Sequence, residues 1–300
     1  MTIHVLLIVA LWLSAFNGAG HAATAGVATQ QAMVRVALVG FSGQQGGDAL
    51  EAALRNGLAG SAQVALIDPA QVKPAVAGVG YDGSINMTRD EARRLGAAIG
   101  CDFFIIGKRD AFTRSEAKQE SHEEALVGVM IVDARTGELA VFDFINERSA
   151  SRNAAWQAVA ARLAAHAAGY SERMIRHRAE RDAARGATAS AERVEDLPDA
   201  ESSAAAGFAP PEFFNRAKPD YTDAADRADI TATVEALAVF RADGTVGEIH
   251  ITRWAGFGLD EAAARAIRQL KFKPASREGR PISVRATVRY NFRRLNAPNN

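Results

Sequence analysis

The sequence predicts two domains, an N-terminal α/β layer domain and a smaller C-terminal α+β domain, joined by a linker. Three patterns carry this prediction. Strand-like and helix-like hydrophobic patterns alternate over residues 33–175, which is typical of layered α/β domains. Residues 176–211 are charged at first and then rich in Ala, Ser, Glu, Asp and Pro, with little to bury. Residues 212–294 contain a hairpin, a helix and a closing amphipathic strand.

The N-terminal domain is expected to follow the order β-α-β-α-β-β-β-α. Short apolar runs predict its strands, and apolar residues spaced three and four apart predict its helices. Thr88 and Glu91 form the signature of a capping box, so a helix should begin there. The expected strands are 34–41, 64–67, 103–107, 126–132 and 139–144, and the expected helices are 46–58, 88–99 and one that runs on from residue 153.

The last of these helices changes character along its length. Up to Met174 its apolar residues recur at helical spacing, so this face should pack on the sheet. Beyond Arg176 the residues are almost all charged or alanine as far as Gly186. Because acidic residues interleave with basic ones, we interpret this part as a solvated helical extension rather than a nucleic-acid-binding stripe. Residues 187–211 are interpreted as a flexible linker.

The C-terminal domain is expected to be a three-stranded antiparallel sheet with one helix across it. Alternation over residues 232–240 predicts the first strand, and Asp243-Gly244 predicts a tight turn into a partner strand. An apolar stripe predicts a helix over residues 259–270. The closing strand, residues 282–292, alternates apolar and polar side chains, as a strand with one buried face does.

The closing strand is also expected to have a free edge. Only the short tail Arg293 to Asn300 follows it, so little remains to cover its backbone groups. An uncovered edge is a candidate for pairing with another chain, which could be a partner protein or a second copy of this one.

Composition excludes some classes of function. The apolar share is 48%, enough for packed cores, and 35 acidic residues balance 35 basic ones. No bulk attraction to nucleic acid or membrane is therefore expected. Cys101 is the only cysteine, so no intramolecular disulfide can form, and a small buried role is favoured over that of a nucleophile.

The first 25 residues predict a secretory leader. An apolar run from Val5 to Phe16 precedes small residues that suit cleavage after Ala22 or Ala25. The run is shorter than the roughly 20 residues that a spanning helix needs. We therefore expect cleavage and export, with a retained membrane anchor as the alternative.

Two segments contain residues that could form a chemical site. The glycine-rich loop from Gly40 to Gly47, with Asp68 after the next strand, has the placement of a dinucleotide-binding loop but not the G-x-G-x-x-G spacing, so a simple turn is favoured. A cluster of acidic residues and one histidine does not match H-E-x-x-H, so we expect a solvated loop without metal. The cluster consists of Glu116, Glu120, His122, Glu123 and Glu124. No nucleophile motif is present, so we predict neither an enzyme nor a bound cofactor.

The C-terminal domain resembles the C-terminal domain of the TonB energy-transducer family. The matching segments are Lys218-Pro219-Asp220-Tyr221, Phe240-Arg241-Ala242-Asp243-Gly244-Thr245-Val246, Gly258-Leu259-Asp260-Glu261-Ala262-Ala263, Ala266-Ile267-Arg268-Gln269-Leu270-Lys271-Phe272-Lys273-Pro274-Ala275 and Gly279-Arg280-Pro281-Ile282. They occur in the family's order, and their combination is more specific than any one of them.

This resemblance implies a periplasmic protein that captures an extended segment of an outer-membrane receptor, or of another envelope protein, as an added strand. The closing strand would receive the segment, and its arginines would attract acidic partners. The implied partner-binding residues are Lys218, Tyr221, Ile282, Val284, Arg285, Ala286, Thr287, Val288, Arg289, Tyr290 and Asn291. The alternative is an energy transducer anchored in the inner membrane.

The N-terminal domain more loosely resembles periplasmic α/β domains of the curli-secretion lipoprotein, the N-terminal part of TolB and the activators of penicillin-binding proteins. Residues 36–41, 95–107 and 132–138 carry this resemblance. It implies an assembly or scaffold role, with no catalytic residue to transfer.

Overall fold

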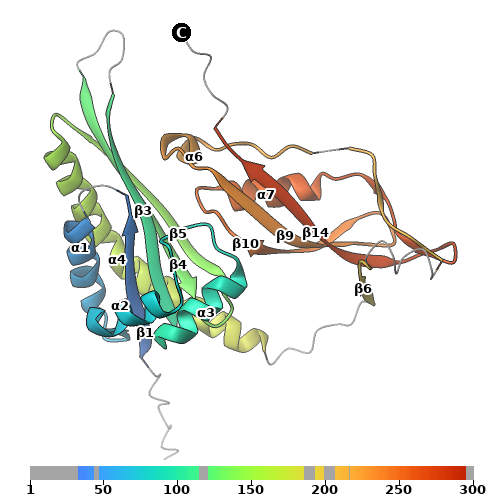
Figure 1. Cartoon of the computed structure of the whole chain (residues 1–300), viewed down its shortest axis with the longest axis horizontal. Coiled ribbons are helices and arrows are strands. Elements are labelled where there is room, and N and C mark those ends of the chain that lie inside the picture. The colour runs from blue at the N-terminus through green and yellow to red at the C-terminus, as the bar shows by residue number, and fades with distance from the viewer. Residues whose placement is uncertain are drawn as a thin grey trace, which may run out of the picture. The chain divides into compact units, whose positions relative to one another are not determined.

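The computed structural model describes residues 33–43, 47–114, 121–185, 193–198, 207–215 and 217–294. The predicted leader at residues 1–25 lies outside this part of the chain. No helix in the described ranges combines the length and the apolar character needed to cross a membrane. Two larger sheets organise the described residues, one in the N-terminal region and one in the C-terminal region (Figure 1). Two small sheets, of two and three strands, also lie in the C-terminal region.

The N-terminal region is built on a five-stranded sheet of order β2-β1-β3-β4-β5. Strand β1 is parallel to β2 and β3, whereas β3, β4 and β5 are antiparallel. Helices α1 and α4 cover one face, and α2 and α3 pack on the other (Figure 1). The elements are β1 (Val34–Ser42), α1 (Gly47–Ala59), β2 (Val64–Leu66), α2 (Pro69–Gly78), α3 (Arg89–Ile99), β3 (Phe103–Arg114), β4 (His122–Asp133), β5 (Leu139–Ser149) and α4 (Arg152–Ala184).

The capping box predicted at Thr88 is confirmed. Thr88 Oγ1 accepts from the backbone N–H of Glu91 at 3.2 Å, and the Thr88 N–H donates to Glu91 Oε2 at 2.7 Å. One helix was not predicted. Asp68 caps α2 by accepting from the N–H of Ala70 at 2.8 Å, and Pro69 suits the first helical turn, where no backbone donor is needed.

The prediction of a solvated acidic loop is wrong for its last three residues. His122, Glu123 and Glu124 lie in β4, which pairs with β3 as far as Arg114. Glu124 is fully buried, yet its carboxylate has charged partners: Arg114 at 2.8 Å and Arg227 at 3.1 Å. The strand continues through charged sequence because these partners compensate the buried charge. Glu116 and Glu120 lie outside the described residues.

Helix α4 also contacts the sheet through charged side chains that follow its apolar part. Arg181, only 7% exposed, donates to the buried carboxylate of Asp133 at 2.6 Å, and His177 Nε2 lies 3.3 Å from the same oxygen. Burial would raise the pKa of Asp133, but His177, the backbone N–H groups of Thr136 and Arg135, and Arg181 outweigh it and bring the pKa to about 2. The charged end of α4 therefore contacts the domain at this point.

The C-terminal region contains a sheet of order β10-β9-β14-β6, with α7 on one face. Strands β10, β9 and β14 form the predicted antiparallel sheet, and β6 adds a fourth strand that is parallel to β14. The elements are β6 (Val194–Asp196), β7 (Phe208–Ala209), β8 (Glu212–Phe213), α6 (Asp223–Arg227), β9 (Ala232–Phe240), β10 (Val246–Arg253), α7 (Leu259–Arg268), β11 (Phe272–Lys273), β12 (Ser276–Arg277), β13 (Arg280–Pro281) and β14 (Ser283–Phe292).

The flexible linker predicted over residues 187–211 is interrupted by two short strands. Val194–Asp196 pairs with β14, and Phe208–Ala209 pairs with β12. Phe208 is buried in the core of the C-terminal region, so this core begins before residue 212.

The two regions share one hydrophobic core. Phe257, fully buried, lies 4.9 Å from Phe142 and 5.7 Å from Phe144 between ring centroids. The indole N–H of Trp254 donates to the carbonyl of Gly137 at 3.1 Å. Phe142 and Phe144 lie in β5 and are half-buried, so Phe257 packs on the same face of the N-terminal sheet as α2 and α3.

Candidate functional site

The edge of β14 is only partly open. On one side β14 pairs with β9 along its length, from Val284 opposite Phe240 to Phe292 opposite Ala232. On the other side β6 pairs with Ser283–Arg285 (Figure 1). The sequence predicted a free edge over residues 282–292, and this prediction is wrong for the part that β6 covers. No strand in the described part of the chain pairs with the edge beyond Arg285.

The backbone groups that face this edge follow from the strand's period of two. The N–H of Leu197 donates to the carbonyl of Arg285 at 3.0 Å, so the backbone of Arg285 faces away from β9. Every second residue of a strand points its backbone groups to the same neighbour. The N–H and C=O groups of Thr287, Arg289 and Asn291 therefore face the open edge.

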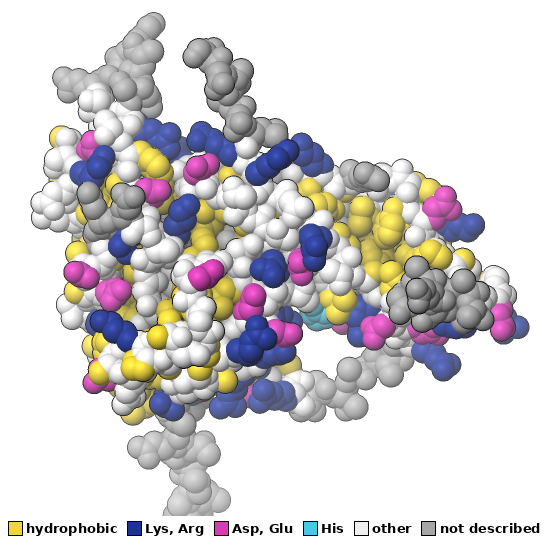
Figure 2. Space-filling model, viewed as in Figure 1, with side chains coloured by type: hydrophobic (Ala, Val, Ile, Leu, Met, Phe, Trp, Pro, Cys, Tyr) yellow, Lys and Arg dark blue, Asp and Glu magenta, His cyan; other side chains and the backbone are white. Residues whose placement is uncertain are grey.

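The side chains beside the open edge alternate in character. Ala286, Val288 and Tyr290 are half-buried and pack at the margin of the C-terminal core. On the other face, Arg289 pairs with Glu235 at 2.8 Å, and Asn291 Oδ1 accepts from Thr233 Oγ1 at 2.9 Å. Figure 2 shows hydrophobic side chains gathered on the C-terminal part of the face that it draws. A partner strand would thus meet apolar side chains as well as backbone groups.

A groove adjoins the end of this edge. It has a volume of about 930 Å³ and is lined by residues 217–221 and 290–293. The hydroxyl of Tyr290 donates to the carbonyl of Ala217 at 3.0 Å and fixes one segment against the other. The hydroxyl of Tyr221 donates to the carbonyl of Ile230 at 2.7 Å. Two predicted site residues, Lys218 and Tyr221, therefore lie next to the open edge.

Two other predicted site residues are less available. Val284 is fully buried and lies between β9 and β6. Ile282 is half-buried, and its N–H donates to the carbonyl of Ala275 at 2.9 Å. Their side chains pack in the core of the C-terminal region rather than on a binding surface.

The glycine-rich loop after β1 is held by neighbouring side chains. A Cβ atom added at Gly43 would lie 2.0 Å from the carbonyl oxygen of Arg109, whose guanidinium also donates to the carbonyl of Phe41. Asp68 is engaged as the cap of α2. Close packing of the chain thus accounts for Gly43, and residues 44–46 lie outside the described part.

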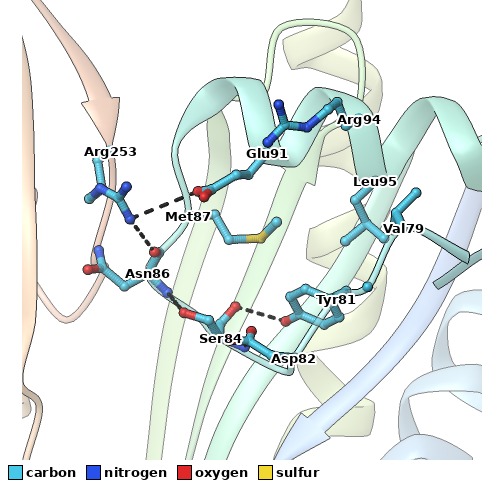
Figure 3. A pocket seen from close by; sticks show the side chains of 11 residues that line it. Val79, Tyr81, Asp82, Ser84, Asn86, Met87, Glu91, Arg94, Leu95 and Arg253 are labelled. Atoms are coloured by element: carbon cyan, nitrogen blue, oxygen red, sulfur yellow. Dashed lines mark hydrogen bonds and ion pairs between the residues drawn. The ribbon is translucent and has the colours of Figure 1, made fainter. Parts of the chain in front are cut away.

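A second pocket lies where α2, α3 and β10 meet, and the sequence did not indicate it. Its volume is about 390 Å³ (Figure 3). Arg253 donates to the carbonyl of Asn86 at 3.0 Å and lies 3.9 Å from Glu91 Oε2. The hydroxyl of Tyr81 donates to the carbonyl of Ser84 at 2.9 Å. These polar groups bind one another, which indicates a structural role.

Within the described ranges, no three His, Cys, Asp or Glu side chains converge as a metal site requires. Cys101 is half-buried, and burial raises the pKa of its thiol to about 12. A thiol of such high pKa is a poor nucleophile at neutral pH.

Residues 217–293 match the family described as the Gram-negative bacterial TonB protein C-terminal. Comparison with curated proteins finds no match. Among solved structures, the Pseudomonas aeruginosa TonB C-terminal domain is similar at 18% identity over 35% of this chain and 99% of that one, with a TM-score of 0.27.

Two further structures are similar at comparable levels. The C-terminal domain of LpoB from Salmonella enterica matches at 15% identity, over 40% of this chain and 85% of that one, with a TM-score of 0.28. A lipoprotein from Neisseria meningitidis matches at 14% identity, over 46% of this chain and 99% of that one, with a TM-score of 0.33.

Proposed function

We propose, from the premise that residues 217–293 form a domain of the TonB C-terminal type, that this chain is a non-enzymatic interaction protein of the cell envelope. It captures an extended segment of another envelope protein as an added strand on β14. The observation that carries this function is the open edge at Thr287, Arg289 and Asn291, which lies beside the groove at Tyr290.

The physical basis of capture is backbone pairing. Each hydrogen bond formed with the edge contributes about 0.5–1.5 kcal/mol net, so a few of them give a weak and reversible complex. Backbone pairing makes little demand on sequence, and specificity comes from side chains. An apolar partner residue would enter the groove beside Tyr290, and acidic residues would approach Arg289 and Arg293.

We further infer that residues 1–25 are a cleaved leader and that the protein acts in the periplasm. The alternative, an anchored energy transducer, would keep these residues. The mass of the mature protein separates the two: a start at Ala23 or Gly26 supports export, and an intact Met1 supports the transducer.

The direct test blocks the edge without changing the core. Thr287→Pro removes an N–H group that faces the open edge, whereas Thr287→Ala keeps that N–H group and removes the side chain's hydroxyl. The two full-length variants and the parent are crosslinked in envelope extracts. Capture lost in Thr287→Pro and kept in Thr287→Ala supports strand addition, and equal capture by both variants overturns it. If the partner is a second copy of this chain, the parent forms dimers that Thr287→Pro does not.

A further inference from the structure

A segment of the chain's own linker lies on the binding edge. Val194, Glu195 and Asp196 pair in parallel with Ser283, Val284 and Arg285. Leu197 extends the contact by donating its N–H to the carbonyl of Arg285 at 3.0 Å. This is the backbone geometry that a captured partner strand would adopt on the same edge.

The side chains of β6 show what the edge accepts. Glu195 lies 2.7 Å from Arg277 in β12, and Asp196 lies 3.4 Å from Arg285 in β14. Arg289 lies farther along β14, where it pairs with Glu235 at 2.8 Å, and Arg293 directly follows the end of the strand. The edge therefore favours an extended acidic segment that runs parallel to β14.

The contact is weak enough to be displaced. It comprises three residue pairs, and no residue of β6 belongs to the hydrophobic core of the C-terminal region. In the Asp196–Arg285 pair the two side chains are 84% and 41% exposed. Such exposed pairs contribute little to stability. Leu197 is 40% exposed, so β6 has little apolar surface holding it in place.

We propose that β6 is an internal competitor for the partner-binding edge. It covers Ser283–Arg285 in the absence of a partner and is displaced by a partner strand that pairs along the whole of β14. This inference rests on the proposed function, because it concerns the same edge. It adds the chemistry of the partner, an acidic extended segment parallel to β14, and a means by which weak or short segments are rejected.

The test uses a labelled synthetic peptide with the sequence of residues 191–200, added to the full-length protein. Because Leu197 donates toward β14, the N–H of Glu195 faces the same way, and Glu195→Pro removes that donor. Asp196→Pro is the matched control, because the N–H of residue 196 faces away from β14. A tethered segment acts at roughly millimolar concentration, so a peptide that binds the free edge at about 0.1 mM should bind the parent about tenfold more weakly than Glu195→Pro.

Amide hydrogen exchange measures whether β6 is paired with β14 when no partner is present. The amide of Arg285 should be protected in the parent and in Asp196→Pro, and should exchange faster in Glu195→Pro. Equal protection in all three proteins, or peptide binding that Glu195→Pro does not strengthen, overturns the inference. Failure of the proposed function has a different signature: Thr287→Pro keeps its envelope partners while Arg285 exchange still responds to Glu195→Pro.

Discussion

Arg227 in α6 donates to the buried carboxylate of Glu124 in β4, with 3.1 Å between Nη1 and Oε1. Arg114 also binds this carboxylate, and Arg148 lies 4.0 Å from it. Burial raises the pKa of Glu124, but hydrogen bonds from Asn146 and Arg114 and the charge of Arg227 lower it below its usual value. One carboxylate thus joins the N-terminal sheet to helix α6.

Replacing this carboxylate should destabilise the protein. Glu124→Gln removes the charge that compensates the nearby arginines, and each charged hydrogen bond lost costs about 1.5–3 kcal/mol. Chemical denaturation measures the change. Glu123→Gln is the matched control, because its partner Arg152 is 42% exposed and such pairs contribute about 0–1 kcal/mol. Equal effects of the two variants would show that burial of Glu124 has no energetic consequence.

Phe257 should be the largest single contributor to the contact between the two regions. Its ring is fully buried against Phe142 and Phe144, so Phe257→Ala should cost about 3–5 kcal/mol. Thermal unfolding, followed in both regions, measures the stability that Phe257→Ala removes. Phe214→Ala, at a side chain that is 66% exposed, should change stability by less than about 0.5 kcal/mol. A small effect at Phe257 would mean that the shared core is not formed in solution.

Substitution of Gly128 by alanine should destabilise the protein only while Phe257 is present. A Cβ atom at Gly128 would lie 2.5 Å from Cζ of Phe257, so Gly128→Ala should cost about 1–3 kcal/mol by overpacking. In the Phe257→Ala background the same change should cost little. A double-mutant cycle of unfolding free energies measures this coupling. Additive effects would contradict the contact.

Asp260 should make stability depend on pH. Its carboxylate accepts from the N–H groups of Ala255 and Gly256 at 2.9 and 2.8 Å, and burial raises its pKa to about 7. This value lies above the pKa of Asp260 in the unfolded chain. Protonation of Asp260 therefore stabilises the folded state at low pH, and this stabilisation is lost as pH rises through about 7.

Asp260→Asn should remove this loss. Denaturation midpoints at pH 5 and pH 8 should differ more for the parent than for the variant. Interaction with Asp133 also raises the pKa of His177, so the difference between parent and variant isolates Asp260. An unchanged pH profile in Asp260→Asn would show that Asp260 does not titrate in this range.

Local signals predicted much of the fold. Thr88 and Glu91 predict the start of α3, because a capping box needs only two residues that lie three positions apart. The Asp243-Gly244 turn was equally local: Thr245 donates its N–H to Asp243 Oδ1 at 2.9 Å. The TonB-like domain was identified because several such segments occur in the family's order.

The features that sequence reasoning missed depend on distant partners or on weak local patterns. Strand β6 has three residues in a low-complexity segment, and its partners on β14 lie far along the chain. Glu124 looked solvated because its arginines come from three other elements. Helix α2 contains Pro69 and Pro74 and buries only Val72, so its pattern was too weak to detect.

The Gly256-Phe257-Gly258 segment has a consequence for how the chain can be divided. All three residues have positive φ, which is unusual for a bulky residue such as Phe257 and places it between two glycines. Because the ring of Phe257 packs in the core that the two regions share, each half should lose stability when it is made without the other. A protease that cuts the linker should leave two pieces that stay together, and each piece made alone should recover its stability only when the other is supplied.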